Sequence, residues 1–298
     1  MSSYEKSIVQ ERFSHYFDEL PELNLADFMV AVPTIKHREG MTLSQLNFFP
    51  FRYIFINSSE AFLYEKEISD GWRPIFRTKP GLAETRNQIL QYFKDSDCKY
   101  LIMVDDDLKY RKTIIKDDVF QTVEVSDPES IWLQELGRVV RDNIDVLSII
   151  NTQYLTAKVT ESVMEDKPAV DYSGIVYSRA IFDNNYWYET KPETCEDQFM
   201  AKLLLVDPYL KCRPTIIMKR ETQQNSKGTS TFGDMDGHKS WQDNTNDILE
   251  YLTLNGFTAE MMNQLWTPEH RPVRRYPLGY KRHKKYIQET PKWDKFLK

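Results

Sequence analysis

Short apolar runs punctuate the chain, and amphipathic stretches with helical spacing lie between several of them. The apolar runs predict strands at residues 27–33, 51–57, 101–104, 144–151 and 170–177. Apolar residues at helical spacing predict helices at residues 58–63, 80–94, 128–141, 195–205 and 245–254. The stretch that precedes residue 128 is charged and reads as irregular. This alternation predicts an α/β fold, Rossmann-like, with a mostly parallel twisted sheet flanked by helices.

Length and composition agree with a folded α/β protein. The 298 residues, 41% of them hydrophobic, suffice for one sizeable domain, although two independent domains are also compatible with this length. No apolar run approaches the roughly 20 residues of a membrane span, and the first residues lack the features of a signal peptide. We therefore expect a cytoplasmic protein without a membrane span. The three scattered cysteines predict reduced thiols, with neither a disulfide nor a zinc site.

Charge divides the chain into an acidic body and a basic end. Residues 269–298 hold ten Lys or Arg against three Asp or Glu, which gives this segment a net charge of +7. Because the whole chain carries −6, the remaining residues carry −13. We therefore divide the chain into a main domain, 1–268, and a basic tail with aromatic residues, 269–298. The tail is a candidate for binding a polyanion, and a solvated or self-docking tail is the alternative. The candidate contacts are Arg274, Arg275, Lys281, Arg282, Lys284 and Lys285.

The strand at residues 101–104 ends abruptly at three aspartates, Asp105, Asp106 and Asp107. Carboxylate oxygens are ligands that Mg²⁺ and Mn²⁺ prefer, and open α/β sheets bind ligands at the carboxyl ends of their strands. The sequence therefore favours a divalent-cation site at this edge. A solvated loop that caps the next segment is the alternative.

Five segments in order carry a resemblance to a known family. They are residues 30–34 (VAVPT), 81–87 (GLAETRN), 102–107 (IMVDDD), 172–176 (YSGIV) and 195–199 (CEDQF). Together they resemble the nucleotide-sugar-dependent glycosyltransferases of the GT-A fold with an Asp-x-Asp motif. The resemblance implies a GT-A-like sheet, a nucleoside-diphosphate sugar as donor (UDP-sugars first among them) and Mn²⁺ or Mg²⁺ as cofactor. It places the nucleotide-binding part at about residues 27–110 and the acceptor part at about residues 140–240.

The resemblance also implies a set of metal ligands. Asp107 would bind the metal directly, and Asp105 would face the ribose or the metal's water shell. Asp106 occupies the variable position, but a triple aspartate leaves the register open by one residue, so Asp106 also counts as a donor contact. His238 would be the third ligand, in competition with the aspartates of residues 234–236.

Donor contacts follow from the same resemblance. Pro33 and Thr34 would lie against the nucleotide base, with Arg38 or the preceding histidine nearby; a simple strand-ending turn is the alternative. Arg86 and Asn87 would support the nucleotide site, where the planar Arg fork can reach a phosphate. As the alternative, Arg86 pairs only with a nearby carboxylate.

A second acidic centre suggests the catalytic group. In inverting relatives an acidic residue at the position of Asp197 or Glu196 takes the proton of the acceptor hydroxyl, and Asp197 is our first choice. A helix-capping role is the alternative. In a retaining enzyme these residues would only orient the acceptor.

The sequence suggests an acceptor but leaves other functions open. A hydroxymethylated base in DNA, as bacteriophages glycosylate, would suit the basic tail, and the enzyme would then act in the host cytoplasm. Two further functions stay open: a sugar nucleotidyltransferase, which the single glycine in residues 33–40 disfavours, and a non-enzymatic nucleic-acid-binding adaptor that uses the tail.

Overall fold

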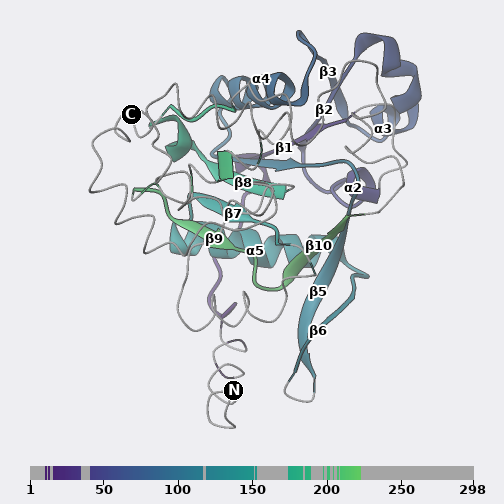
Figure 1. Ribbon diagram of the computed structural model, residues 1–298. Coiled ribbons are helices and arrows are strands. Elements are labelled where there is room, and N and C mark those ends of the chain that lie inside the picture. Colours follow the sequence, from purple (N-terminus) through teal and green to yellow (C-terminus); the bar gives the residue numbers. More distant parts are fainter. Residues whose placement is uncertain are drawn as a thin grey trace, which may run out of the picture.

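The structure is a computed structural model (Figure 1). It describes residues 11, 13, 16–34, 41–116, 119–150, 152, 174–183, 185–188, 197, 200, 201, 204, 207 and 209–222. The strands are β1 Phe28–Pro33, β2 Phe51–Ile56, β3 Arg73–Phe76, β4 Tyr100–Val104, β5 Leu108–Lys116, β6 Val119–Glu124, β7 Val146–Ser148, β8 Gly174–Ser178, β9 Cys212–Pro214 and β10 Met218–Thr222. The α-helices are α2 Met41–Ser44, α3 Glu65–Ser69, α4 Leu82–Lys94 and α5 Pro128–Asp142, and the 3-10 helices are η1 Leu25–Asp27, η2 Ser58–Tyr64 and η4 Arg179–Phe182.

A seven-stranded sheet forms the centre of the fold. Its order is β3-β2-β1-β4-β8-β7-β9, and β8 runs against its neighbours β4 and β7, whereas the other pairings within this sheet are parallel. The prediction of a mostly parallel, Rossmann-like α/β sheet flanked by helices is confirmed, and the arrangement is consistent with a GT-A-like fold. Because β1 and β4 are adjacent and parallel, the segments that follow them meet at the same edge.

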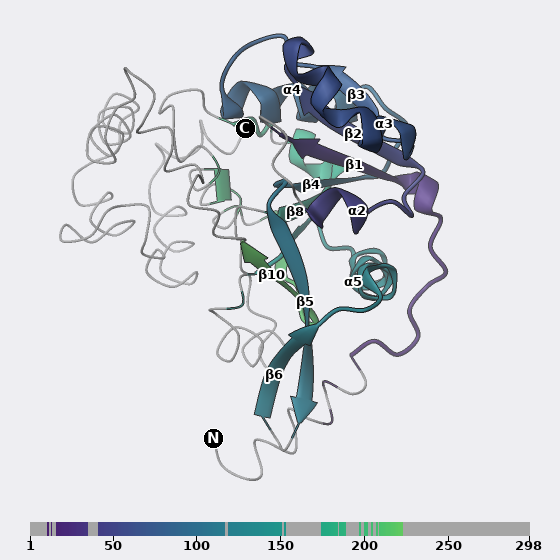
Figure 2. The same ribbon diagram turned by 90° about the vertical axis from the view of Figure 1, so that its right-hand side faces the viewer.

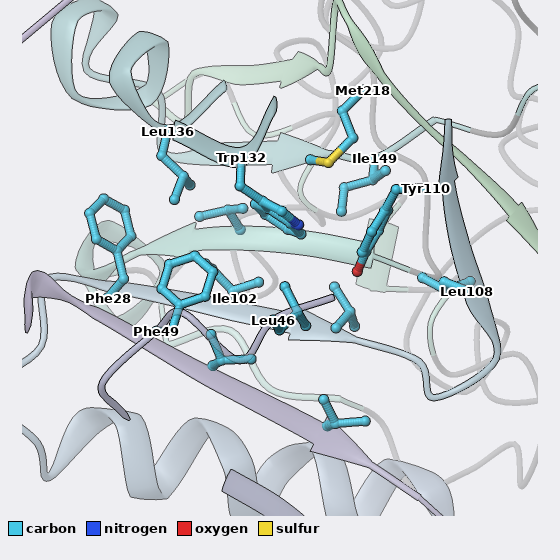
Figure 3. Packing of buried hydrophobic residues seen from close by; sticks show 14 of the residues in the cluster. Phe28, Leu46, Phe49, Ile102, Leu108, Tyr110, Trp132, Leu136, Ile149 and Met218 are labelled. Carbon is cyan, nitrogen blue, oxygen red and sulfur yellow. The ribbon is translucent and has the colours of Figure 1, made fainter. Parts of the chain in front are cut away.

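Helices cover both faces of this sheet, which explains why its strands read as continuous apolar runs. The face that carries Met29 and Ala31 of β1 packs against α4. The opposite face packs against α2 and α5, and Trp132 of α5 is fully buried there. Its ring lies edge-on to Phe49 and Tyr110, with centroid distances of 6.1 and 5.4 Å (Figure 3). Burial on both faces fixes the carboxyl edge of the sheet as a rigid platform.

Both long helices have well-defined ends. Asp127 caps α5 by accepting a hydrogen bond from the Ser130 N–H at 3.2 Å, and Pro128 occupies the first turn. The helix ends at Asn143, whose backbone is left-handed with φ of 50°. Helix α4 starts after Gly81, which has φ of 100°, a value that glycine adopts without steric cost. These ends confirm the predicted helices at residues 80–94 and 128–141.

The charged stretch before residue 128, predicted as irregular, is a β-hairpin, so that prediction was wrong. Strands β5 and β6 pair with each other, and β10 joins β5 to form a separate three-stranded sheet. The hairpin extends away from the seven-stranded sheet in both views (Figures 1 and 2). Buried Leu108 and Tyr110 alternate with Lys109 and Arg111, which pair with Glu124 at 2.8 and 2.9 Å. The high charge of the stretch favours a loop, whereas the alternation of apolar and basic residues at 108–111 is the period of a half-buried strand.

A buried carboxylate attaches the second sheet to α5. Glu135 is fully buried, and its Oε2 accepts a hydrogen bond from Arg138 Nη2 at 2.9 Å. Its Oε1 accepts three backbone N–H groups at 2.6, 2.7 and 3.1 Å, from Ile216, Ile217 and Met218. A buried ionised pair of this kind is retained only when its hydrogen-bonding capacity is filled. Glu135 thereby fixes the turn from which β10 runs to β5.

Other sequence predictions differ from the structure in detail. Strand β7 is shorter than predicted, the predicted helix at 58–63 is the 3-10 helix η2, and the sequence pattern did not reveal α2, β3, β9 and β10. Residues 197, 200, 201 and 204 of the predicted helix 195–205 are helical, whereas 245–254 lies outside the described residues. In the described part, Cys98 and Cys212 are buried free thiols, and no helix is long and apolar enough to cross a membrane.

Candidate functional site

The three aspartates form the turn between β4 and β5, and the middle one faces inward. Asp106 is 5% exposed, and its carboxylate accepts a hydrogen bond from the Thr34 hydroxyl. Thr34 also shares a hydrogen bond with the Tyr64 hydroxyl at 2.8 Å. Because Ala31 of β1 stands beside Met103 of β4, the same register brings Thr34, which follows β1, to Asp106. Asp106 therefore joins the ends of two adjacent strands.

Asp105 and Asp107 flank this inward residue and are partly exposed. The Asp105 side chain is 28% exposed, and its Oδ1 accepts a hydrogen bond from Arg86 Nη2 at 3.0 Å. Asp107 is half-buried. One inward residue thus separates two partly exposed carboxylates, which is the spacing of an Asp-x-Asp motif. Among the described residues, Asp105 Oδ2 has no hydrogen-bond donor, so it is available to a ligand.

The chemistry of this pair suits a divalent cation that shares a phosphate ligand. No group of three or more His, Cys, Asp or Glu side chains in the described part of the chain could hold a metal ion. Mg²⁺ in enzymes is commonly held by one or two carboxylates together with water and substrate phosphates, so two aspartates fit that type of site. His238, the predicted third ligand, lies outside the described residues.

One buried arginine links the two predicted acidic centres. Arg86 lies on α4, and its side chain is 3% exposed. While Nη2 binds Asp105, Nη1 lies 3.7 Å from Asp197 Oδ2. The guanidinium carbon also lies 5.4 Å from the ring centre of Tyr188, a cation–π distance. Residues 86, 105 and 197, which are distant in sequence, therefore meet at one place.

Asn87 holds the tyrosine on which this arginine rests. Its side-chain amide donates to the Tyr188 carbonyl at 2.7 Å and accepts the Tyr188 N–H at 2.7 Å. The Tyr188 hydroxyl is 2.7 Å from the Tyr177 hydroxyl, and burial raises the pKa of Tyr177 well above its usual value. The Tyr177 phenol is consequently a neutral partner in this hydrogen bond. Two neighbouring helix positions, 86 and 87, thus fix one wall of the site.

The outgoing strand β5 is held from the opposite side. The Thr42 hydroxyl accepts the Leu108 N–H at 2.8 Å and donates to the Leu108 carbonyl at 2.9 Å, directly after the three aspartates. Arg220 of β10 stands opposite Tyr110 of β5 and is 4% exposed. Burial, followed by the nearby Asp105 carboxylate, raises the pKa of Tyr110, while Arg220 acts in the opposite direction. Arg220 is therefore a buried positive charge near the acidic turn.

The structure places some predicted site residues together and does not describe others. Pro33 ends β1 as a buried residue, and Thr34, Arg86, Asn87, Asp105, Asp106, Asp107 and Asp197 lie as given above. The predicted residues outside the described part of the chain are Arg38, Glu196, His238 and residues 269–298 with Arg274, Arg275, Lys281, Arg282, Lys284 and Lys285. The assigned roles of all these residues stay predictions.

Sequence reasoning missed several side chains that shape the site. They are Thr42, Tyr64, Tyr177, Tyr188 and Arg220. No local motif marks them, since each acts through a partner that is distant in sequence. The one usable signal was the Tyr-x-Tyr pattern of residues 186–188 after a strand, whose aromatic side chains are buried at 3% exposure.

Comparisons with known proteins add a weak likeness in structure. No protein-family model matches the chain, and no curated protein matches it in sequence. A solved structure of CMP:2-keto-3-deoxy-manno-octonic acid synthetase complexed with CTP is similar over 63% of this chain and 88% of that chain. The TM-score is 0.35 and the sequence identity is 9%. A likeness at this level assigns neither a substrate nor a reaction to this chain.

Proposed function

We propose that the protein is a metal-dependent glycosyltransferase that moves a sugar from a nucleoside-diphosphate sugar to a hydroxyl group. One observation carries this proposal. Arg86 brings Asp105, the first carboxylate of the Asp-x-Asp pair, and Asp197, the predicted base, to a single guanidinium at the sheet edge where α/β folds bind ligands. A sugar transfer needs both a place for a leaving diphosphate and a group that accepts a proton. The two acidic centres supply these two needs.

The donor side of the site consists of the acidic turn and the end of β1. In the proposal, Asp107 holds Mn²⁺ or Mg²⁺, and the available oxygen of Asp105 binds the ribose or the metal's water shell. Such a cation, when bound, neutralises charge on the leaving diphosphate. Asp106 fixes Thr34 at the base-binding end of β1. A direct contact of Asp106 with the donor stays a prediction.

The acceptor side contains the proposed general base. As the acceptor oxygen forms its bond to the anomeric carbon, its proton passes to the Asp197 carboxylate. The bond between the anomeric carbon and the phosphate oxygen breaks, and its electron pair leaves with the nucleoside diphosphate. In the proposal the Asp197 carboxylate lies beside Arg86, whose Nη1 is 3.7 Å from Asp197 Oδ2. This sequence of events corresponds to an inverting transfer.

A donor screen tests the proposal. The protein is incubated with Mn²⁺ and each common nucleoside-diphosphate sugar, and release of the nucleoside diphosphate is followed in the absence of an acceptor. We expect slow hydrolysis with one donor and its loss in a chelator or in Asp107→Asn. Asp95→Asn is the matched control, because Asp95 follows the last residue of α4, away from Arg86, and its carboxylate accepts hydrogen bonds from the Gln91 side chain. Turnover that survives in Asp107→Asn contradicts the metal assignment.

A parallel incubation with a nucleoside triphosphate and a sugar phosphate tests the alternative reaction. A sugar nucleotidyltransferase would release pyrophosphate from a nucleoside triphosphate and a sugar phosphate. That result, without any hydrolysis of nucleoside-diphosphate sugars, overturns the proposal.

The proposal also includes an acceptor. A hydroxymethylated base in DNA is the candidate that the basic tail suggests, and the tail lies outside the described residues. Once the donor is known, transfer to hydroxymethylated DNA is compared with transfer to unmodified DNA at increasing salt. Steep loss of binding with salt supports contacts between the tail and phosphates, whereas a salt-independent reaction contradicts them.

A further inference from the structure

The contacts of Arg86 differ from those of an arginine that is exposed to bind a phosphate. Its side chain is almost fully buried, its two terminal amino groups contact different carboxylates, and its guanidinium carbon lies 5.4 Å from the ring centre of Tyr188. A buried charge is stable only while it is paired. Arg86 therefore has a settled position before any donor arrives.

Both carboxylates contact the same guanidinium. Asp105 is held at 3.0 Å and Asp197 at 3.7 Å. The closer contact is on the donor side, so Arg86 and a cation bound at the acidic turn compete for the negative charge of Asp105. Anything that changes one contact changes the charge available to the other.

We propose that Arg86 is a positioning residue that couples the donor side of the site to the general base. It sets where Asp197 stands relative to Asp105, and occupation of the acidic turn is felt at Asp197 through the shared guanidinium. The inference rests on the proposed function for the roles of the two carboxylates. The coupling itself is a property of three side chains and does not require turnover.

The supporting contacts keep this bridge rigid. Tyr188, beneath the guanidinium, is fixed by two hydrogen bonds to Asn87 and one to Tyr177. Asn87 follows Arg86 on the same helix, so the arginine and its support move together. Linkage between two sites requires a rigid contact that transmits a shift from one site to the other, and Asn87 and Tyr188 provide that rigidity.

The first experiment measures cation binding, with Mn²⁺ alone as the probe. Free Mn²⁺ is followed by electron paramagnetic resonance during titration of the wild type, Asp197→Asn, Arg86→Lys and the double variant. In the wild type, loss of the Asp197 charge directs Arg86 to Asp105, so the dissociation constant of Mn²⁺ should rise about five-fold or more. In the Arg86→Lys background, a compact ammonium cannot span both carboxylates, and the rise should be below about two-fold.

Two results of that experiment overturn the inference. An equal rise in both backgrounds means that Asp197 acts on the cation directly through space. No rise in the wild type means that the carboxylates are independent. A merely structural Arg86 would lower the unfolding midpoint in Arg86→Lys and leave the response of Mn²⁺ binding to Asp197→Asn unchanged.

A second experiment decides the matter if the wild type binds no Mn²⁺, a result that defeats the metal assignment of the proposed function. The unfolding equilibrium is measured for Asp105→Asn, Asp197→Asn and the double variant. A shared guanidinium predicts that the two effects depart from additivity by at least about two-fold in the equilibrium constant. The pair Asp95→Asn and Asp197→Asn, which shares no partner, serves as the additive control. Additivity in both pairs refutes the coupling, whereas a departure confined to the Asp105 pair sustains it.

Discussion

Replacing Asn87 by alanine should loosen Tyr188, the residue that packs against the Arg86 guanidinium. The substitution removes the two hydrogen bonds of 2.7 Å that tie α4 to the backbone of Tyr188. It leaves the polar backbone groups of Tyr188, a residue only 3% exposed, without these partners. The ring beneath the guanidinium then loses its anchor, although its hydroxyl still meets Tyr177. We expect lower stability together with poorer function.

The magnitude follows from the two bonds. A net contribution of about 0.5–1.5 kcal/mol for each gives a loss of about 1–3 kcal/mol in the free energy of unfolding. Gln88 is the matched control, because the next residue on the same helix also makes two backbone hydrogen bonds, to Phe76 at 2.9 Å and to Thr78 at 3.0 Å. These bonds are solvent-exposed, so water replaces them in Gln88→Ala. The control should lose less stability than Asn87→Ala.

Urea denaturation followed by tryptophan fluorescence measures the stability of both variants, and donor hydrolysis measures function. Asn87→Ala should reduce hydrolysis, because Arg86 loses its support, whereas Gln88→Ala should retain it. Equal midpoints for the two variants would show that the Asn87 contacts do not stabilise the fold. A destabilised Asn87→Ala protein with full activity at a temperature where it is folded would refute the link between this wall and the site.

Three further predictions concern the surrounding structure. Glu135→Ala leaves the buried Arg138 and three N–H groups without their acceptor, so it should cost about 3–5 kcal/mol in urea denaturation, and a loss below 1 kcal/mol would contradict that account. Thr42→Val removes both hydrogen bonds to Leu108 and should cost about 1–3 kcal/mol by the same assay, while an unchanged midpoint would count against it. Burial raises the pKa of Tyr110 and of Tyr177, so at high pH the native state retains protons that the unfolded chain releases. The free energy of unfolding should therefore be unaffected below pH ~10 and fall as the pH rises above it. A flat profile between pH ~9 and ~11 would contradict this.

The central elements could be predicted from sequence, because the strands buried on both faces are continuous apolar runs and the helices repeat apolar residues at helical spacing. Strands β1, β2 and β4 and helices α4 and α5 lie close to the predicted ranges. The hairpin of β5 and β6 is hidden by its high charge, because its Lys and Arg find their carboxylate partners only across strands, although residues 108–111 alternate between apolar and basic. Strand β9 has three residues, too few for a period to be visible.

The candidate site, too, could be predicted only in part from the sequence. The acidic triplet and Arg86-Asn87 stand out as local patterns, but the sequence does not show which aspartate faces inward. That answer depends on the register of β1 against β4, which brings Thr34 to Asp106. The meeting of Arg86 with Asp197 depends on how α4 packs beneath β8 and the residues after it, which is a property of tertiary structure.

The reversed direction of β8 has a consequence for redesign. Strand β7 ends at Ser148 beside Ile175 near the start of β8, so the chain leaves and re-enters the sheet at the same edge, the one that carries the acidic turn. Both attachment points of this connection therefore lie at the edge of the acidic turn. Under the proposed function, a foreign segment grafted between these two points is a way to test whether the choice of acceptor can be altered.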